Sequence, residues 1–138
     1  MRQLGTHLLL EMSGCSSEFL NSTENIQKAL LQAATEARAT VLGSSFHKFS
    51  PQGVSGVVVI AESHISIHTW PEFGYAAVDV FTCGDRAMPN EAAVSLVKAF
   101  APSLHEIREI ARGIPGQAGD RPGERQPTWR PPVDRGWA

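Results

Sequence analysis

Residues 53–85 read GVSGVVVIAESHISIHTWPEFGYAAVDVFTCGD and contain three apolar runs separated by short polar or turn-forming segments. The runs Val54–Ala61, Ile65–Trp70 and Tyr75–Cys83 have the length and the β-branched composition of strands. Residues 71–74 (PEFG) connect the last two runs, and a connection this short implies an antiparallel hairpin. This stretch therefore predicts the antiparallel centre of a β-sheet.

The rest of the chain predicts three more strands and two helices. The additional strands, in chain order, are residues 3–12, Val41–Phe49 and Leu104 to about Ala111. Ser22 or Thr23 can cap a helix that runs to about Arg38, because their side-chain oxygens accept hydrogen bonds from the first free N–H groups. Pro89 suits the first turn of a second helix.

Apolar residues recur at helical spacing in both predicted helices and indicate which face of each is buried. They are Ile26, Leu30, Ala33 and Ala37 in the first helix, and Val94, Val97 and Phe100 or Ala101 in the second. Together with the hairpin-like links between strands, this pattern predicts the α+β class, a mostly antiparallel sheet with two helices on one face.

The central strands are apolar on both of their faces. The run GVVVI (residues 56–60) is apolar throughout, and in YAAVDVF (residues 75–81) both alternating sets of side chains are largely apolar. Strands of this kind are buried on both faces, whereas two helices cover only one. The sheet therefore predicts a homodimer in which a second copy covers the other face.

Length and composition predict a single domain and exclude several partners. The chain has 138 residues and a net charge of −2, and its Lys and Arg are scattered, so we expect no binding to nucleic acid. No segment approaches the roughly 18 apolar residues of a membrane span. Two cysteines form no disulfide framework, which favours the reducing cytoplasm. We expect one domain at residues 1–113 and a disordered Pro/Gly/Arg-rich tail at 114–138.

The polar residues within the core strands permit two familiar chemistries, and neither is well supported. A metal site would use His47, His64, His68 and Cys83, but His64 and His68 lie about 13 Å apart along a strand. Zinc binds its ligands at about 2 Å, so we predict no metal. A hydrolase built on Ser63 with His64 or His68 would lack the GxSxG turn that exposes such a serine.

Backbone chemistry is a third possibility for the same residues. The Ser63 hydroxyl can attack the preceding carbonyl and convert the amide of Glu62 into an ester. β-Elimination then breaks the chain, and hydrolysis leaves a pyruvoyl group in place of Ser63 with loss of ammonia. This group forms a Schiff base with a substrate amine and accepts the electrons released on decarboxylation. Ser55 and His68 are candidates to polarise the carbonyl and to remove the Ser63 α-proton.

Three stretches favour this third chemistry through their resemblance to a known family. They are LGTHLLLEM at residues 4–12, TVLGSSFHKFSPQGVSG at residues 40–56 and the opening stretch at residues 53–85. Together they resemble the small prokaryotic S-adenosylmethionine decarboxylases, which are pyruvoyl-dependent, self-processing proenzymes. The resemblance covers roughly residues 3–112, and the combination of ESH, IHTWPE and FTCG in one chain is highly specific. The tail departs from the family's usual short ending and contains none of these motifs.

The resemblance implies a role for each motif residue. It implies cleavage between Glu62 and Ser63, with Ser63 becoming the covalently bound pyruvoyl cofactor. His68 would be the base for processing, assisted by Ser55. Cys83 would be the acid that reprotonates the substrate carbon after carbon dioxide leaves.

The resemblance also implies the substrate and the assembly. Phe49 would stack on the adenine of S-adenosylmethionine and Glu72 would bind the ribose hydroxyls. The product would be the aminopropyl donor for spermidine synthesis. Two protomers would pack sheet against sheet into a four-layer αββα sandwich and share each active site.

Two alternatives remain open at the level of sequence. The same pyruvoyl chemistry can act on arginine or ornithine, since only the walls of the pocket would differ. A non-catalytic paralogue that regulates an active partner would keep the fold without the activity, although the complete set of motif residues argues against it. No catalytic role is assigned to the remaining polar and aromatic residues of this region: His47, His64, Asp79, Cys15, Trp70 and Tyr75.

Overall fold

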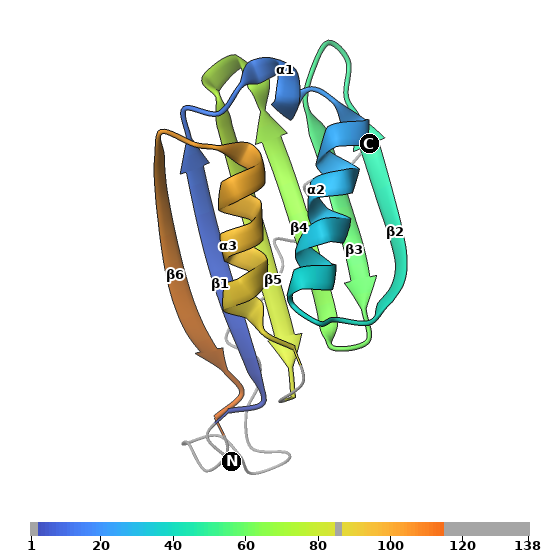
Figure 1. Cartoon of the computed structure of the whole chain (residues 1–138), viewed down its shortest axis with the longest axis vertical. Coiled ribbons are helices and arrows are strands. Elements are labelled where there is room, and N and C mark those ends of the chain that lie inside the picture. The colour runs from blue at the N-terminus through green and yellow to red at the C-terminus, as the bar shows by residue number, and fades with distance from the viewer. Residues whose placement is uncertain (1–2, 85–86, 115–138) are drawn as a thin grey trace, which may run out of the picture.

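One antiparallel sheet organises the protein (Figure 1). The computed structural model describes residues 3–84 and 87–114. The strands are β1 (Gly5–Ser13), β2 (Val41–Lys48), β3 (Val54–Ile60), β4 (Ser63–Trp70), β5 (Tyr75–Cys83) and β6 (Leu104–Arg112). Their order across the sheet is β2-β3-β4-β5-β1-β6, and all neighbours are antiparallel. The predicted antiparallel sheet is confirmed, while the proposed tail lies outside the described residues from residue 115 onward.

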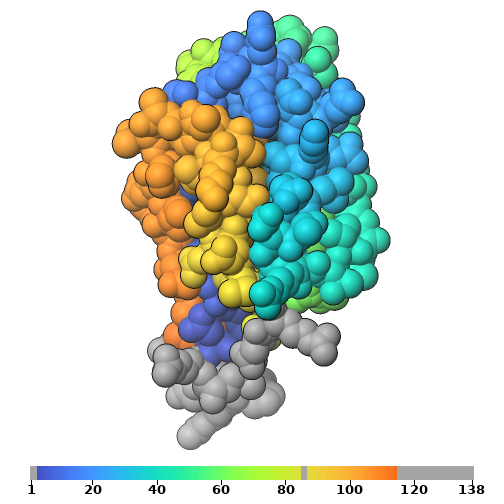
Figure 2. Space-filling view, viewed as in Figure 1, coloured from blue at the N-terminus to red at the C-terminus, as the bar shows by residue number. Residues whose placement is uncertain are grey.

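The helices lie on one face of this sheet, as predicted (Figures 1 and 2). They are α1 (Ser17–Leu20), α2 (Thr23–Glu36) and α3 (Pro89–Phe100), and a 3-10 turn, η1 (Pro71–Phe73), joins β4 to β5. The Ser22 hydroxyl caps α2 by accepting a hydrogen bond from the Asn25 N–H at 3.2 Å, and Pro89 opens α3. The sequence did not predict α1, whose four residues show no periodicity.

The buried face of α2 is the predicted one, but that of α3 is rotated from the prediction. Val94 is 47% exposed, whereas Ala92, Ala93 and Leu96 are buried. Phe100 is buried as expected. Because α3 carries apolar residues around most of its circumference, the spacing alone did not identify the side that faces the sheet.

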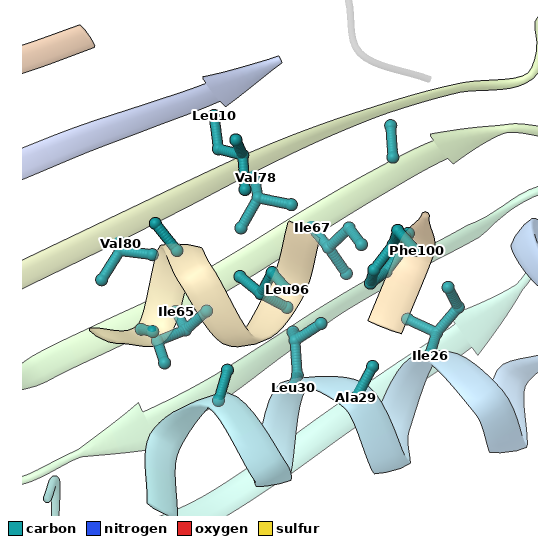
Figure 3. Close-up of a cluster of buried hydrophobic side chains, with 14 of the residues drawn as sticks. Leu10, Ile26, Ala29, Leu30, Ile65, Ile67, Val78, Val80, Leu96 and Phe100 are labelled. Carbon is teal, nitrogen blue, oxygen red and sulfur yellow. The ribbon is translucent and has the colours of Figure 1, made fainter. Parts of the chain in front are cut away.

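The core fills the space between the helices and the sheet (Figure 3). From the strands, Leu10, Ile65 and Ile67 point toward the helices and are fully buried. Leu30 of α2 and Leu96 of α3 meet them from the opposite side. The described residues contain no helix long and apolar enough to cross a membrane.

The opposite face of the sheet is not covered by any described element. Val59 and Trp70 on this face are 44% and 39% exposed, and Ile110 of the edge strand β6 is 43% exposed. Polar pairs lie among these apolar side chains, including His7 and Asp79, whose Nε2 and Oδ1 atoms are 2.9 Å apart. Homodimerisation through this face stays a prediction.

Candidate active site

The turn between β3 and β4 holds the Glu62 carbonyl in a polar contact. The Cys83 N–H, at the end of β5, donates a hydrogen bond to the Glu62 carbonyl oxygen at 2.7 Å. On the other side of the turn, the Thr40 N–H donates to the Glu62 Oε1 atom at 2.8 Å. The Ala61 N–H donates to the Thr40 carbonyl, also at 2.8 Å. The Ala61–Glu62 segment is therefore held both from β5 and from the residue that precedes β2.

Ser63 follows this held carbonyl and has a strained backbone. Its φ is 145°, in a region that residues with a Cβ rarely adopt. Such a conformation persists only where the surroundings enforce it, and Ser63 is fixed between Ile60 of β3 and Thr82 of β5. Its Oγ lies 3.2 Å from His64 Nδ1. β4 thus begins at Ser63, two residues earlier than predicted, and the strain lies at its first residue.

A second cluster lies at the far end of β4. Ser55 and His68 are directly opposite each other on β3 and β4, and Ser55 Oγ lies 2.8 Å from His68 Nδ1. His47 faces Ser55 from β2, and its ring contacts the Phe49 ring edge to face with centroids 4.6 Å apart. Phe49 is close to half exposed at the β2–β3 turn.

Glu72 lies at the same end of the sheet as this second cluster. It is exposed on η1, in the β4–β5 connection, one strand pair away from Phe49. The two connections lie at one end of the antiparallel sheet, opposite the Ser63 turn (Figure 1). The predicted substrate-binding residues therefore accompany Ser55 and His68.

The predicted site residues thus form two clusters instead of one. Glu62, Ser63 and Cys83 meet at the β3–β4 turn. His68 is five residues farther along β4, which corresponds to about 16 Å at the rise of a strand. A general base must lie within hydrogen-bond reach of the proton that it removes, so His68 does not reach Ser63 of the same chain.

Sequence reasoning missed Thr40, whose contribution is a backbone N–H. It is 22 positions from Glu62, and only the register of β2 against β3 brings the two together. His64, for which the sequence predicts no catalytic role, contacts the Ser63 hydroxyl. Among the described residues, no group of three or more His, Cys, Asp or Glu side chains is placed to hold a metal ion.

Tyr75 and Glu11 form a further polar pair on the uncovered face. The Tyr75 hydroxyl donates a hydrogen bond to the Glu11 carboxylate. Burial raises the pKa of Tyr75 to about 12, and this hydrogen bond and the charges of Glu11 and Asp79 act in the same direction. The phenol is therefore neutral over the physiological range. Burial also raises the pKa of the Cys15 thiol, which belongs to the core.

Comparison with known proteins identifies the family. The family model described as S-adenosylmethionine decarboxylase matches residues 6–113, which is more than half of the chain. The chain belongs to the S-adenosylmethionine decarboxylase family. The resemblance seen in the sequence motifs is thereby confirmed, and the match covers every strand and helix described above except Gly5, the first residue of β1.

Individual relatives agree with this assignment. The chain is 52% identical to the S-adenosylmethionine decarboxylase proenzyme of Thermodesulfovibrio yellowstonii over 114 residues, covering 83% of this chain and 84% of the relative. It is 54% identical to the proenzyme of Moorella thermoacetica, with 83% and 91% covered. The crystal structure of the adenosylmethionine decarboxylase from Aquifex aeolicus VF5 superimposes with a TM-score of 0.79 at 36% identity, covering 88% of this chain and all of that one. The predicted fold class is confirmed.

Proposed function

We propose that the chain decarboxylates S-adenosylmethionine after cutting itself between Glu62 and Ser63. Members of its family are pyruvoyl-dependent, self-processing carboxy-lyases, and its relatives are named as proenzymes. A local feature of the backbone supports cleavage at this bond. Ser63 has a strained backbone directly after a carbonyl that accepts a 2.7 Å hydrogen bond from the Cys83 N–H.

This arrangement suits the first step of processing. Attack of Ser63 Oγ on the Glu62 carbonyl carbon places negative charge on the carbonyl oxygen, where the Cys83 N–H already donates. Breaking the C–N bond relieves the strain at Ser63 and leaves an ester with a free amine. Removal of the Ser63 α-proton then expels the Glu62 carboxylate. Hydrolysis of the resulting dehydroalanine releases ammonia and leaves the pyruvoyl group.

His68 is the proposed base for the α-proton, and a second protomer would supply it. A twofold axis perpendicular to the strands reverses strand direction in the partner sheet. The Ser63 end of one β4 then faces the His68 end of the other, which removes the separation of about 16 Å within a protomer. The uncovered sheet face, with half-exposed Val59 and Trp70, supports this homodimer, the αββα sandwich of the family.

The remaining residues suit the decarboxylation. When present, the pyruvoyl group supplies a carbonyl that binds the substrate amine and accepts the electrons released with carbon dioxide. Cys83 is exposed beside the cleavage site, where its thiol can donate the proton that replaces the carboxylate. Phe49 offers an aromatic face to the adenine and the sulfonium charge, and Glu72 offers a carboxylate to the ribose hydroxyls. Both cysteines are free, which fits the proposed cytoplasmic location.

The names of the relatives favour S-adenosylmethionine over arginine and ornithine as the substrate. Release of carbon dioxide from all three compounds, supplied in turn and in competition, tests this choice. We expect turnover of S-adenosylmethionine alone and no turnover by Ser63→Ala. The intact mass of wild-type protein should show two fragments, with the C-terminal one lighter by the mass of ammonia than hydrolysis alone would give. An uncut, inactive wild-type chain would contradict the proposal.

Mixed dimers test where the base comes from. Ser63→Ala cannot be cut, and His68→Ala keeps its serine but supplies no base. In a mixed dimer, the intact Ser63 of one protomer faces the intact His68 of the other. We therefore expect cutting of the His68→Ala chain only when the two variants, carrying different tags, are produced together. Mixed dimers that stay uncut would show that the base acts within one protomer.

A further inference from the structure

The Glu62 side chain makes a contact that the proposed cleavage chemistry does not use. Its Oε1 accepts the Thr40 N–H at 2.8 Å, and the Thr40 carbonyl accepts the Ala61 N–H at the same distance. Both backbone groups of Thr40 are thus bonded to the two residues immediately before the cleavage site. On the opposite side, the Glu62 carbonyl contacts the Cys83 N–H.

An irregularity in β2 creates this contact. The pairing of β2 with β3 shifts register between Val41 and Gly43, so that Val41 lies opposite Ile60. Continuing the register from Gly43 without the shift would place Val41 opposite Ala61. The extra residue instead moves Thr40 to that position, where its N–H faces the Glu62 carboxylate. Bulges of this kind are common beside active sites, where they redirect a group that regular pairing would place elsewhere.

We propose that the Glu62 carboxylate is a positioning residue for self-cleavage, acting through the Thr40 N–H. A strained residue relaxes unless its neighbours are fixed, and the Ser63 φ of 145° needs the Glu62 peptide plane to stay in place. The side-chain bond to Thr40 fixes Glu62 from one side while the Cys83 N–H fixes its carbonyl from the other. Without the first bond, the carbonyl can turn away from Cys83 and the strain is released. This inference rests on the proposed cleavage at Glu62–Ser63.

Side-chain variants of Glu62 test the proposal through the rate of cutting. Freshly made chains from cell-free synthesis are followed by mass spectrometry as uncut precursor disappears. Glu62→Ala removes the acceptor, and loss of one hydrogen bond to a charged group predicts cutting slower by about tenfold. Glu62→Gln keeps an amide oxygen at the same reach, so we expect its rate within about threefold of wild type.

Two substitutions of Thr40, the donor of this hydrogen bond, provide a matched test. Thr40→Pro deletes the N–H and leaves the carbonyl, and its rate should fall as far as that of Glu62→Ala. Thr40→Ala keeps the N–H and should cut like wild type. Both substitutions remove the same hydrogen bond. The double variant, Glu62→Ala with Thr40→Pro, should therefore be cut no more slowly than either single variant. Melting of each variant in a Ser63→Ala background, which cannot be cut, verifies that it folds.

The other outcomes would refute either the positioning role of Glu62 or the proposed cleavage. Equal rates for Glu62→Ala and wild type would refute the positioning role while leaving the cleavage proposal intact. Slow cutting by Glu62→Gln would show that the negative charge acts directly, without the Thr40 contact. Fast cutting by a folded Thr40→Pro would show that cleavage does not need the Thr40 contact. Failure of the wild-type chain to cut would instead contradict the cleavage proposal itself.

Discussion

Replacing Thr69 by Val tests the junction that holds the His68 end of β4. Thr69 is 7% exposed, and its hydroxyl accepts a hydrogen bond from the Val54 N–H at 2.9 Å. The same hydroxyl donates to the Leu20 carbonyl at the end of α1, at 2.8 Å. Through one oxygen atom, the start of β3, the end of β4 and the first helix are joined. Valine has nearly the same shape, so the substitution removes these hydrogen bonds without leaving a cavity.

The expected cost follows from the two backbone groups that lose their partner. An unsatisfied buried donor or acceptor costs about 1–3 kcal/mol, and Thr69→Val leaves one of each. The higher strand propensity of valine offsets only a small part of this. We therefore expect the free energy of unfolding to fall by about 2–5 kcal/mol. With a urea dependence of about 1.5–2 kcal/mol/M, the unfolding midpoint would drop by roughly 1–3 M.

The assay is urea unfolding followed by circular dichroism in a Ser63→Ala background, so that every chain is intact. Protein concentration is held constant, because association stabilises folded protomers. Thr35→Val is the matched control, since the Thr35 hydroxyl is exposed and donates only to the Leu31 carbonyl of its own helix. It should change stability by less than about 0.5 kcal/mol. A Thr69→Val variant as stable as this control would refute the assigned role of the buried hydroxyl.

Two further predictions concern Gly56 and Tyr75. A Cβ at Gly56 would overlap the Phe46 ring, so Gly56→Ala should lower the free energy of unfolding by about 1–3 kcal/mol. A Cβ at Gly43, on the neighbouring strand, meets nothing within 4 Å, so Gly43→Ala should lower it by less. Urea unfolding of the two variants tests this difference. The folded state raises the pKa of Tyr75 from 10.0 to about 12, so the neutral phenol bonded to Glu11 stabilises the fold fully below pH 10 and loses this effect as pH rises to 12. Melting temperatures of wild type and Tyr75→Phe should therefore converge over this pH interval, and a constant difference would contradict the shift.

The strands were predictable because each is a short apolar run that ends at a turn signal. Tyr75–Cys83 was predicted with its observed bounds, and Ser22 was a predicted cap of α2. The errors arose where local pattern carries little information. α1 is too short to show a period, and α3 is apolar on several sides, so packing against β1 and β5 decides that Ala93 and Leu96 face inward and Val94 outward.

The sequence motifs proposed the members of the candidate site, but they did not predict how the fold arranges them. The motifs named Ser63 and His68 as members of one site, yet a strand separates residues by about 3.3 Å each, and five positions are enough to take them out of reach. That limit follows from the sequence as soon as both residues are assigned to one uninterrupted strand. The contact of Thr40 with Glu62 is different, because it depends on a register shift in β2 that no local motif encodes.

The distance between Ser63 and its proposed base, His68, would determine when the chain is cut. Within one protomer, the Glu62 carbonyl is held and Ser63 is strained as soon as β3, β4 and β5 pair. In the proposed mechanism, that much prepares the attack of the hydroxyl, and an amide-to-ester shift of this kind is reversible. Elimination requires the α-proton to leave, and in the proposed homodimer His68 would reach this proton only when a second sheet covers the first. Folding would thus prepare the Glu62–Ser63 bond for attack, and association would make the cleavage irreversible. The pyruvoyl group would then form only in the homodimer that uses it.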